Sequence, residues 1–525
     1  MYHYFNVLCA LLIGVAQGTP LLGSPTHHAR NQQIQWSPCE ANGTLATECA
    51  TFPVPLDYTN EASNATLNLE LIRIRAPNSP SKGSVFFNFG GPGDNGKLSL
   101  ATYGPMLQAA TGGYHDLVVL TPRGTGNTIL FSCYATDEER AAAKTLYPEL
   151  AGNASDVALG YNNVSSGVFA DTCYATQNNT GQFMTSAFAA RDYMRVLDAL
   201  GGDGLLRYWG EAIRTIELLC AQPADRGLWI GRVILDGVAN PHEFYQNRDL
   251  QMLVDTDKVL TGFCEECVAT PDKCPLAPGR SAAEIEEAIY ELIDHVKFNP
   301  LLLPVAGTPI LVDYTTFKTQ IFSVLYSPTG WDDFSTFLDN IMTGKLEEAG
   351  EYFAKISSGP PSLDAEAQFG IKCSDSYRTD NSEEEVLELI KQRHELSRIG
   401  GDVSDFVLTR CVEWKIKPKE RYTGDFQATT KNPLLIIGNT ADPVTPLAAA
   451  RNVSAGFANS VVLEHGSYGH ASLGQASLCT AKATRAYFMD GTLPEPGTKC
   501  EIDTTPFSGD NGWEKVLKEL AADSQ

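Results

Sequence analysis

The stretch Leu206–Leu218, LRYWGEAIRTIEL, holds the feature that decides the fold. Leu206–Gly210 is a short apolar run that ends at a glycine, which is typical of a buried strand followed by a sharp turn. Two runs of the same design precede it, at Ser84–Asn88 and Asp116–Leu120. Strands that are apolar along their whole length are buried on both faces, as in a parallel sheet. The three runs therefore predict a parallel core.

Other segments extend this core in both directions. Ala50–Asn60 and Ala65–Pro77 alternate apolar and polar residues, which indicates an opening antiparallel hairpin. Ser186–Leu200 has apolar residues at helical spacing and is followed by glycine, so a helix is expected there. Further apolar runs occur at Gly231–Asp236 and in two later segments, residues 434–441 and 461–468. Because strands alternate with helices, the fold class is α/β, with a doubly wound, mostly parallel sheet.

The middle of the chain has a different pattern. Residues 246–428 contain helical patterns such as Ala282–Val296 and Ser382–Leu396, with no convincing buried strand. We interpret this range as a helical cap inserted into the core. The core is then expected in two parts, residues 30–245 and residues 429–525.

The N-terminus has the pattern of a signal peptide. Phe5–Ala16 is apolar but too short to span a bilayer, and small and turn-forming residues follow it. We expect residues 1–18 to be cleaved and the protein to be secreted and extracellular. No later segment is long and apolar enough to be a stable membrane anchor. Six Asn-x-Ser/Thr sequons support secretion as candidate glycosylation sites, at Asn42, Asn64, Asn153, Asn163, Asn178 and Asn452.

The cysteine content also fits an oxidising compartment. Of 13 cysteines, Cys9 lies in the leader, which leaves an even number in the mature chain. Cys39 with Cys49 and Cys479 with Cys500 are plausible disulfides, although sequence alone does not fix the pairing. The CEEC motif at Cys264–Cys267 could indicate redox chemistry or zinc. Since no second CxxC or histidine pair has ligand spacing, a structural disulfide involving Cys274 is favoured.

Charge narrows the choice of partners. The chain has 39 Lys and Arg against 63 Asp and Glu, a net charge of -24, which repels nucleic acid and anionic lipid. We therefore expect no nucleic acid partner, and the sequence gives no indication of a cofactor or a metal. The oligomeric state cannot be predicted from these features.

Chemistry in such sheets is expected at the carboxyl ends of the strands. Asp442 and His470 each follow a predicted strand, and the glycines Gly90 and Gly91 follow another. A carboxylate that orients an imidazole, beside backbone N–H groups freed by glycine, gives the acid, base and oxyanion hole of a serine hydrolase. Taken singly, Asp442 could cap a helix that begins near Pro446, His470 could lie in a surface loop and GGPG could be a turn. Their chain order after the strand at Leu206 matches the α/β-hydrolase fold.

Six motifs together resemble the secreted tripeptidyl-aminopeptidase-like α/β-hydrolases, relatives of the prolyl aminopeptidases. The motifs are NFGGPG (Asn88–Gly93), PRGTGNT (Pro122–Thr128), YWG (Tyr208–Gly210), GRVILDGVANP (Gly231–Pro241), NTADPVTP (Asn439–Pro446) and GSYGHASLGQASLC (Gly466–Cys479). The resemblance covers nearly all of the mature chain and includes a TAP-like C-terminal region. It implies a cap that admits a peptide's free N-terminus, and serine attack that releases a short N-terminal piece. By position, Asp442 and His470 would be the catalytic acid and base, with Gly90 and Gly91 in the oxyanion hole.

The sequence departs from this family at the turn itself. Ala212 stands where the family has its nucleophilic serine, Arg214 stands where it has the second glycine of G-x-S-x-G, and Thr121 replaces an aspartate before PRGTG. Alanine has no hydroxyl for His470 to deprotonate, so the acyl-enzyme route is closed in the chain as written. Glu211, Ser467 and Cys220 are the nearest substitute nucleophiles, and none is favoured.

Three alternatives therefore stay open. The protein could be a pseudoenzyme that binds peptides without cutting them. The reading of the gene between Glu211 and Ile230 could be altered, because both flanks match the family and only this range loses the pattern. The same scaffold could also serve an esterase, since a serine-type triad acts on small esters as well as on peptides. An apolar cap pocket without an acidic anchor for the substrate's ammonium group would favour the esterase.

Overall fold

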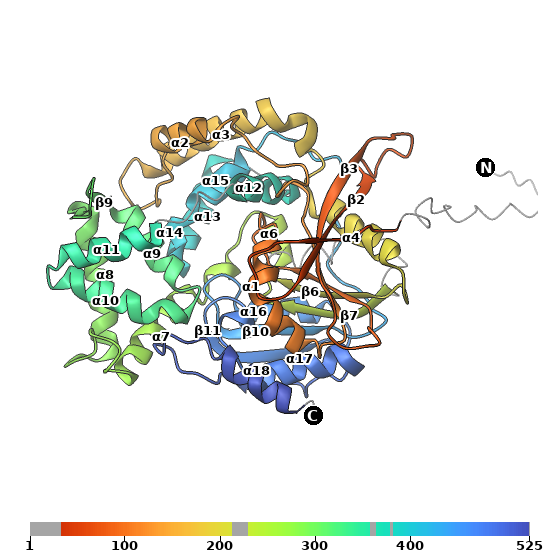
Figure 1. The fold of residues 1–525 in the computed structure, drawn as a ribbon. Coiled ribbons are helices and arrows are strands. Elements are labelled where there is room, and N and C mark those ends of the chain that lie inside the picture. The colour runs from red at the N-terminus through yellow and green to blue at the C-terminus, as the bar shows by residue number, and fades with distance from the viewer. Residues whose placement is uncertain (1–32, 213–228, 358–363, 378–381, 524–525) are drawn as a thin grey trace, which may run out of the picture.

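The computed structural model describes residues 33–212, 229–357, 364–377 and 382–523, and its core is one large twisted sheet (Figure 1). The strand order is β1-β2-β3-β5-β4-β6-β7-β10-β11-β12, parallel from β5 to β12 and antiparallel from β1 to β5. The strands of this sheet are β1 (Ser37–Cys39), β2 (Thr47–Pro55), β3 (Thr66–Ile74), β4 (Ser84–Asn88), β5 (Asp116–Leu120), β6 (Leu206–Glu211), β7 (Ile230–Asp236), β10 (Leu435–Ala441), β11 (Val461–Tyr468) and β12 (Lys499–Glu501). The opening hairpin is β2 and β3, and the expected mostly parallel α/β sheet is confirmed.

Helices cover both faces of the sheet because its central strands are apolar on both sides. Phe86 and Phe87 of β4 are both buried, and as neighbours on a strand they point to opposite faces. Phe86 packs with residues of α4 and α16, and Phe87 packs with residues of α1, α17 and α18. These helices are α1 (Lys97–Ala110), α4 (Ser186–Leu200), α16 (Leu447–Ala455), α17 (Leu478–Asp490) and α18 (Trp513–Ala522).

A second, mostly helical region lies between β7 and β10 in the chain and beside the sheet in space (Figure 1). Its elements are α6 (Pro241–Tyr245), α7 (Thr256–Ala269), α8 (Ala282–Phe298), β8 (Leu301–Leu303), β9 (Ile310–Val312), α9 (Tyr314–Val324), α10 (Trp331–Met342), α11 (Leu346–Ser357), α12 (Asp364–Asp375), α13 (Glu383–Leu396), α14 (Gly400–Val403) and α15 (Asp405–Val412). Capping boxes at Ser281 and Ser382 begin α8 and α13, the two helices that the sequence indicates most clearly. Strands β8 and β9 form a short antiparallel hairpin that the sequence pattern did not reveal.

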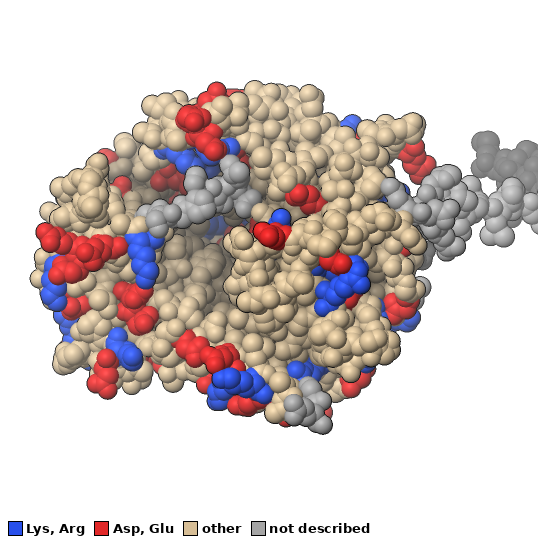
Figure 2. Space-filling view, viewed as in Figure 1, with Lys and Arg blue, Asp and Glu red and all other residues tan. Residues whose placement is uncertain are grey.

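Two earlier helices join this region, although they precede β6 in the chain. They are α2 (Asp137–Leu146) and α3 (Ala158–Gly181). Phe169 of α3 packs against Phe369 of α12, and the Ser166 hydroxyl hydrogen-bonds Thr409 of α15 at 2.9 Å. The helical region therefore includes residues outside the range 246–428. Helical periodicity did not predict this, because α2 and α3 join the region through contacts between distant segments. The molecular surface is hollowed between the lobe of α8 to α11 and the core (Figure 2).

Five disulfides link the cysteines of the described residues. Both expected bridges are present, Cys39–Cys49 and Cys479–Cys500, and the CEEC motif contributes a third, Cys267–Cys274. The remaining two are Cys133–Cys173 and Cys373–Cys411. Cys264 is a free, buried thiol, while Cys9 and Cys220 lie outside the described residues.

The N-terminal features stay predictions. The expected signal peptide, residues 1–18, lies outside the described residues. Within the ranges that the structure describes, none of the helices has the length and apolarity to cross a membrane. The asparagines of all six sequons are exposed.

Candidate active site

The carboxyl ends of β4, β6, β7, β10 and β11 meet at one edge of the sheet and bring the candidate residues together. Parallel register pairs Asn88 of β4 with Gly210 of β6, and Glu211 of β6 with Asp236 of β7. Ala212 is the first residue beyond β6, and Gly90 lies two residues beyond β4. The site is built from strand ends because each side chain there is free to face a neighbouring loop.

Ala212 has the backbone conformation of a sharp turn. Its φ is 53°, a left-handed conformation that costs a non-glycine residue about 1–2 kcal/mol. Gly90 is packed so closely that a Cβ on it would lie 2.9 Å from the Ala212 Cβ. The glycine loop and the strand end are therefore in direct contact, as an oxyanion hole beside a nucleophile requires. Arg214 lies outside the described residues.

Asp442 and His470 form an ion pair whose carboxylate is buried and whose imidazole is 19% exposed. The Asp442 carboxylate, which is fully buried, lies 3.0 Å from His470 Nδ1 through Oδ2 and 3.2 Å through Oδ1. The same carboxylate accepts hydrogen bonds from the backbone amides of Val444, Thr445 and Ala471. Asp442 therefore holds the turn that precedes α16 and orients the imidazole, but it does not cap the helix, whose N-cap is Pro446 without a side-chain cap. His470 is not a free surface histidine.

The electrostatics of this pair favour its charged form. The negative charge and hydrogen bond of Asp442 raise the pKa of His470 above 6.5, against the effect of burial. The charge and hydrogen bond of His470, with hydrogen bonds from Thr445 and Val444, lower the pKa of Asp442 below 3.8 although burial opposes this. A carboxylate that stays ionised can hold the imidazole in one tautomer and stabilise the imidazolium.

Two further groups support the histidine, and the sequence analysis missed both. The Thr445 hydroxyl lies 2.7 Å from Asp442 Oδ2 and 2.9 Å from His470 Nδ1. Asp236, at the end of β7, accepts hydrogen bonds from the Ser472 hydroxyl and amide and from Trp209 Nε1 at 3.3 Å. The only signal for Asp236 was its position at a strand end in the motif GRVILDG.

The helical region also contacts the histidine loop. The backbone amide of His470 donates to the Tyr326 carbonyl at 2.8 Å, and the two rings meet edge to face with centroids 5.4 Å apart. Tyr326 follows α9 and is 37% exposed. The histidine loop is thus held from the core side by Asp442 and Asp236, and from the helical side by Tyr326.

The possible substitutes for a serine do not replace it. Ser467 is buried, and its hydroxyl donates to the Tyr468 carbonyl and to Gln475 Oε1. Cys220 lies outside the described residues. Burial and the nearby charges of Asp236 and Asp94 raise the pKa of Glu211 well above 4.5, which makes its carboxyl a poor nucleophile near neutral pH.

Thr121, which stands where the family has an aspartate, connects two loops near the site. Its hydroxyl donates to the Asn95 carbonyl at 3.2 Å, so it joins the loop after β5 to the loop after β4. Nearby, Arg123 is buried and pairs with Asp192 at 2.6 Å, which holds the PRGTG segment against α4. In the described ranges, no group of three or more potential metal ligands is found.

The sheet order and the placement of these loops define the chain as an α/β-hydrolase. The family model described as TAP-like protein matches residues 397–500, the segment that carries Asp442 and His470. The chain therefore carries the TAP-like C-terminal region that its motifs predicted.

Among curated proteins, the chain is 24% identical over 514 residues to "Serine protease Hip1" of Mycobacterium tuberculosis, covering 94% of each chain. It is 23% identical over 483 residues to "Carboxylesterase B" of the same species, covering 89% of this chain and 90% of that protein. The chain is thus similar over most of its length to one protein named as a serine protease and to another named as a carboxylesterase. Both cover nearly the whole chain, so the similarity is not confined to the C-terminal segment.

Solved structures have lower sequence identity to this chain than the curated relatives do. Candida antarctica lipase A in its closed state matches with a TM-score of 0.36 and 12% identity, over 93% of this chain and 90% of that one. A bromoperoxidase from Bacillus anthracis matches with a TM-score of 0.31 and 12% identity, over 84% and 96%.

Proposed function

We propose that this chain carries the site of a secreted serine-type peptidase that releases short N-terminal pieces from peptides, with Asp442 as acid and His470 as base. Ala212 stands at the place of the nucleophile, so the chain as written binds such peptides without cleaving them. The proposal rests on two contacts at neighbouring strand ends, Asp442 with His470 and Gly90 with Ala212. Asp236 links them, because it pairs with Glu211 in the sheet and accepts hydrogen bonds from Ser472 in the histidine loop. Gly90 and Gly91 would supply the oxyanion hole.

The charge around the turn supports a peptide over a neutral ester. Glu211 adjoins Ala212, and Asp236 faces Glu211 across the strand pair β6–β7. Burial, with the nearby charges of Asp236 and Asp94, raises the pKa of Glu211 well above 4.5. A cation beside this carboxyl group, such as the ammonium group of a peptide N-terminus, would lower that pKa and stabilise the ionised form. An ester substrate need not carry a cation.

Secretion is part of the proposal. It is supported by the N-terminal apolar run, by five disulfides and by six sequons whose asparagines are all exposed. The six would be N-glycosylated in a secretory pathway.

The test restores the missing nucleophile. A variant with Ala212→Ser, Ile213→Tyr and Arg214→Gly, named the restored variant, is compared with the unmodified chain. Both are assayed for labelling by a fluorophosphonate probe and for turnover of aminoacyl and ester chromogenic substrates. We expect labelling and aminoacyl turnover in the restored variant and neither in the unmodified chain. Adding His470→Ala to the restored variant should remove both.

Three results would overturn the proposal. Labelling of the unmodified chain would show that another residue is the nucleophile. A folded restored variant without labelling would show that the site is not assembled, and turnover of esters alone would favour the esterase. Sequencing of the transcript across codons 211–230 separates a pseudoenzyme from an altered gene reading, because only the second predicts Ser-Tyr-Gly in another frame.

A further inference from the structure

A cavity lies within the helical region, apart from the residues around Ala212. Its volume is about 550 Å³, which is in the range of small-molecule and peptide sites. It is lined by α2, α3, α9, α11, α12 and α15, and by the loop that joins α2 to α3. The residues that line it include the aromatic Tyr134, Phe169 and Phe369 and the basic Arg140, Lys144 and Arg410.

The guanidinium group of Arg410 packs among three aromatic rings, and most of its N–H donors make no hydrogen bond within the described ranges. Its guanidinium carbon lies 4.3 Å from the ring centroid of Phe169, 4.4 Å from that of Phe369 and 5.4 Å from that of Phe406. Nη1 lies 2.7 Å from Glu149 Oε1, and the two side chains are 14% and 45% exposed. Beyond this ion pair, Arg410 makes no side-chain hydrogen bond among the described residues. A planar guanidinium with free donors is suited to bind a carboxylate with two parallel hydrogen bonds.

The other charged side chains that line the cavity do not occupy the free N–H donors of Arg410. Arg140 is neutralised by Glu366 and Asp137, and its Nη2 donates to Ser132 at 2.9 Å. Lys144 makes no ion pair within the part of the chain that the structure describes. Since Glu149 is half exposed, a carboxylate in the cavity can compete with it for Arg410. Three cations line the cavity beside two carboxylates, Glu149 and Glu366, in a protein whose net charge is -24.

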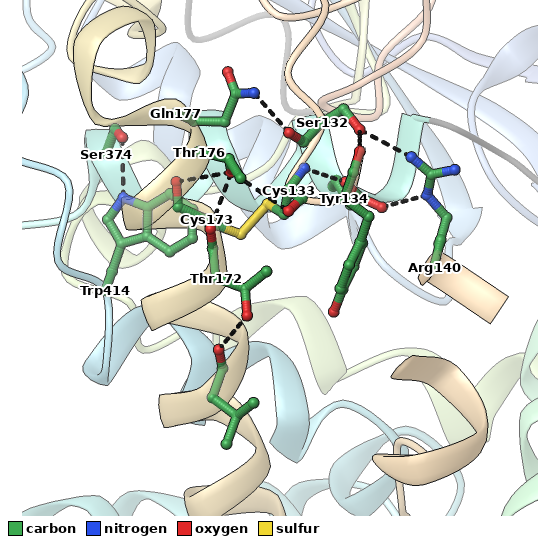
Figure 3. The surroundings of a disulfide bond; sticks show 12 residues. Ser132, Cys133, Tyr134, Arg140, Thr172, Cys173, Thr176, Gln177, Ser374 and Trp414 are labelled. Carbon is green, nitrogen blue, oxygen red and sulfur yellow. Dashed lines mark hydrogen bonds and ion pairs between the residues drawn. A yellow bond between two sulfur atoms is a disulfide. The ribbon is translucent and has the colours of Figure 1, made fainter. Parts of the chain in front are cut away.

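The wall is rigid on the side of Tyr134 and Arg140. Figure 3 shows the disulfide Cys133–Cys173, which ties the segment before α2 to α3. Gln177 of α3 donates to the Ser132 carbonyl at 2.6 Å, and Glu366 accepts from the Cys133 amide. A cavity wall held by a disulfide and by hydrogen bonds on both sides loses little conformational entropy when a ligand binds.

Helix α9 connects this cavity to the histidine loop. Thr315, Thr316, Thr319 and Gln320 of α9 line the cavity, and Tyr326, which follows the helix, contacts His470. Tyr326 lies eleven positions after Thr315, about 16 Å along the chain at the helical rise. An extended peptide covers that distance with about five residues.

We propose that this cavity binds a carboxylate carried on an apolar group, with Arg410 as its partner, and that the carboxylate is the free C-terminus of a short peptide whose N-terminal part reaches the Asp442–His470 pair. The choice of a peptide rests on the proposed function. Val168 and Ile356, apolar lining residues that are 37% and 40% exposed, would contact the side chain of the last residue. Peptides of about five residues or more that end in a free carboxylate would then bind more tightly than shorter or amidated substrates.

The chain as written suits a binding test because it has no serine at position 212 to cleave the probe. Calorimetry compares a pentapeptide of four alanines and a C-terminal phenylalanine with the same peptide amidated at its C-terminus. We expect the free acid to bind at least about tenfold more tightly, as charged hydrogen bonds contribute more than neutral ones. A third probe, 4-phenylbutyrate, distinguishes a free carboxylic acid from a peptide as the source of the carboxylate.

Three variants test whether Arg410 causes the difference in binding between the peptide acid and its amide. Arg410→Gln should abolish the difference between acid and amide. Glu149→Gln removes the competing carboxylate but keeps Arg410, so the acid should bind more tightly and the amide should not change. Arg398→Gln is the matched control, because Arg398 also stacks on an aromatic ring, that of Tyr290 at 3.5 Å, but does not line the cavity.

Equal binding of acid and amide to the unmodified chain would overturn the proposal, as would a difference that persists in Arg410→Gln. Binding of 4-phenylbutyrate that depends on Arg410, without binding of the peptide acid, would overturn the peptide as the ligand. Should Arg410→Gln fail to fold, the expected tightening in Glu149→Gln still decides the matter. Fluorophosphonate labelling of the restored variant does not involve Arg410, so failure here leaves the proposed function standing.

Discussion

Asp236 holds Ser472 through two hydrogen bonds, one from the hydroxyl at 2.5 Å and one from the backbone amide at 3.0 Å. Ser472 lies two residues after His470, so the end of β7 fixes the loop that carries the base. Burial raises the pKa of Asp236 to about 6, and the Ser472 hydrogen bonds oppose this rise.

We predict that Ser472→Ala lowers the free energy of unfolding by about 1–3 kcal/mol, because it removes a buried hydrogen bond to a carboxylate. Urea denaturation at pH 8 measures this. Ser335→Ala is the control, since the fully buried Ser335 donates to the neutral carbonyl of Asp332 and should cost less. Equal losses in the two variants would contradict a special role for Asp236.

The Asp442–His470 pair should make stability depend on pH. Because the pKa of His470 is raised above 6.5, its contribution is complete below pH 6.5 and is lost as the pH rises through the folded-state pKa. Because the pKa of Asp442 is lowered, its contribution is present above 3.8 and is lost as the pH falls through a lower value. The difference in unfolding free energy between the unmodified chain and His470→Gln should therefore be larger at pH 5 than at pH 8. A difference that does not change with pH would refute the ion pair.

The raised pKa of His470 also predicts how the rate of fluorophosphonate labelling of the restored variant depends on pH. His470 accepts the serine proton only when it is neutral, and its pKa is raised above 6.5 by Asp442. The rate of fluorophosphonate labelling should fall as the pH decreases through a value above 6.5. An inflection below pH 6 would show that Asp442 does not stabilise the protonated imidazole.

The contact between the Gly90 loop and Ala212 can be tested by comparing two Gly→Ala substitutions, one in this loop and one outside it. Gly90 and Gly202 have φ of 91° and 92°, but a Cβ on Gly90 would meet Ala212 and the Glu211 carbonyl, whereas one on Gly202 would meet nothing within 4 Å. Both Gly→Ala changes carry the left-handed backbone cost of about 1–2 kcal/mol. Gly90→Ala should destabilise the protein further and abolish labelling when added to the restored variant. Thermal unfolding and labelling of the two substitutions provide the comparison, and equal behaviour would argue against contact between the glycine loop and the turn.

Glycosylation can be tested directly. Because the asparagines of all six sequons are exposed, expression in a eukaryotic secretory host should give a product whose mass falls on enzymatic removal of N-glycans. Peptide mapping after deglycosylation in heavy-oxygen water reports each occupied asparagine. An unglycosylated, intracellular product would contradict the expected secretion.

Local patterns accounted for much of the fold. Apolar runs such as Ser84–Asn88 and Leu206–Gly210 predicted strands, and their alternation with helices predicted the parallel sheet, because burial on both faces leaves a clear signal in the sequence. The hairpin β8–β9 was missed because three-residue strands carry no such signal. The packing of α2 and α3 on α12 and α15 was missed because it depends on contacts between distant segments.

The sequence by itself determined the order of Ala212, Asp442 and His470, their positions after strands, and the absence of a side-chain hydroxyl at position 212. Only the tertiary structure decided that Asp442 reaches His470 Nδ1 and that Gly90 touches Ala212. It likewise decided that Asp236 holds Ser472 and that Tyr326 supports the histidine loop. The physical reason is that residue type and periodicity set which side chains are available and which are buried. Which of them meet depends on strand register and loop packing across the whole chain.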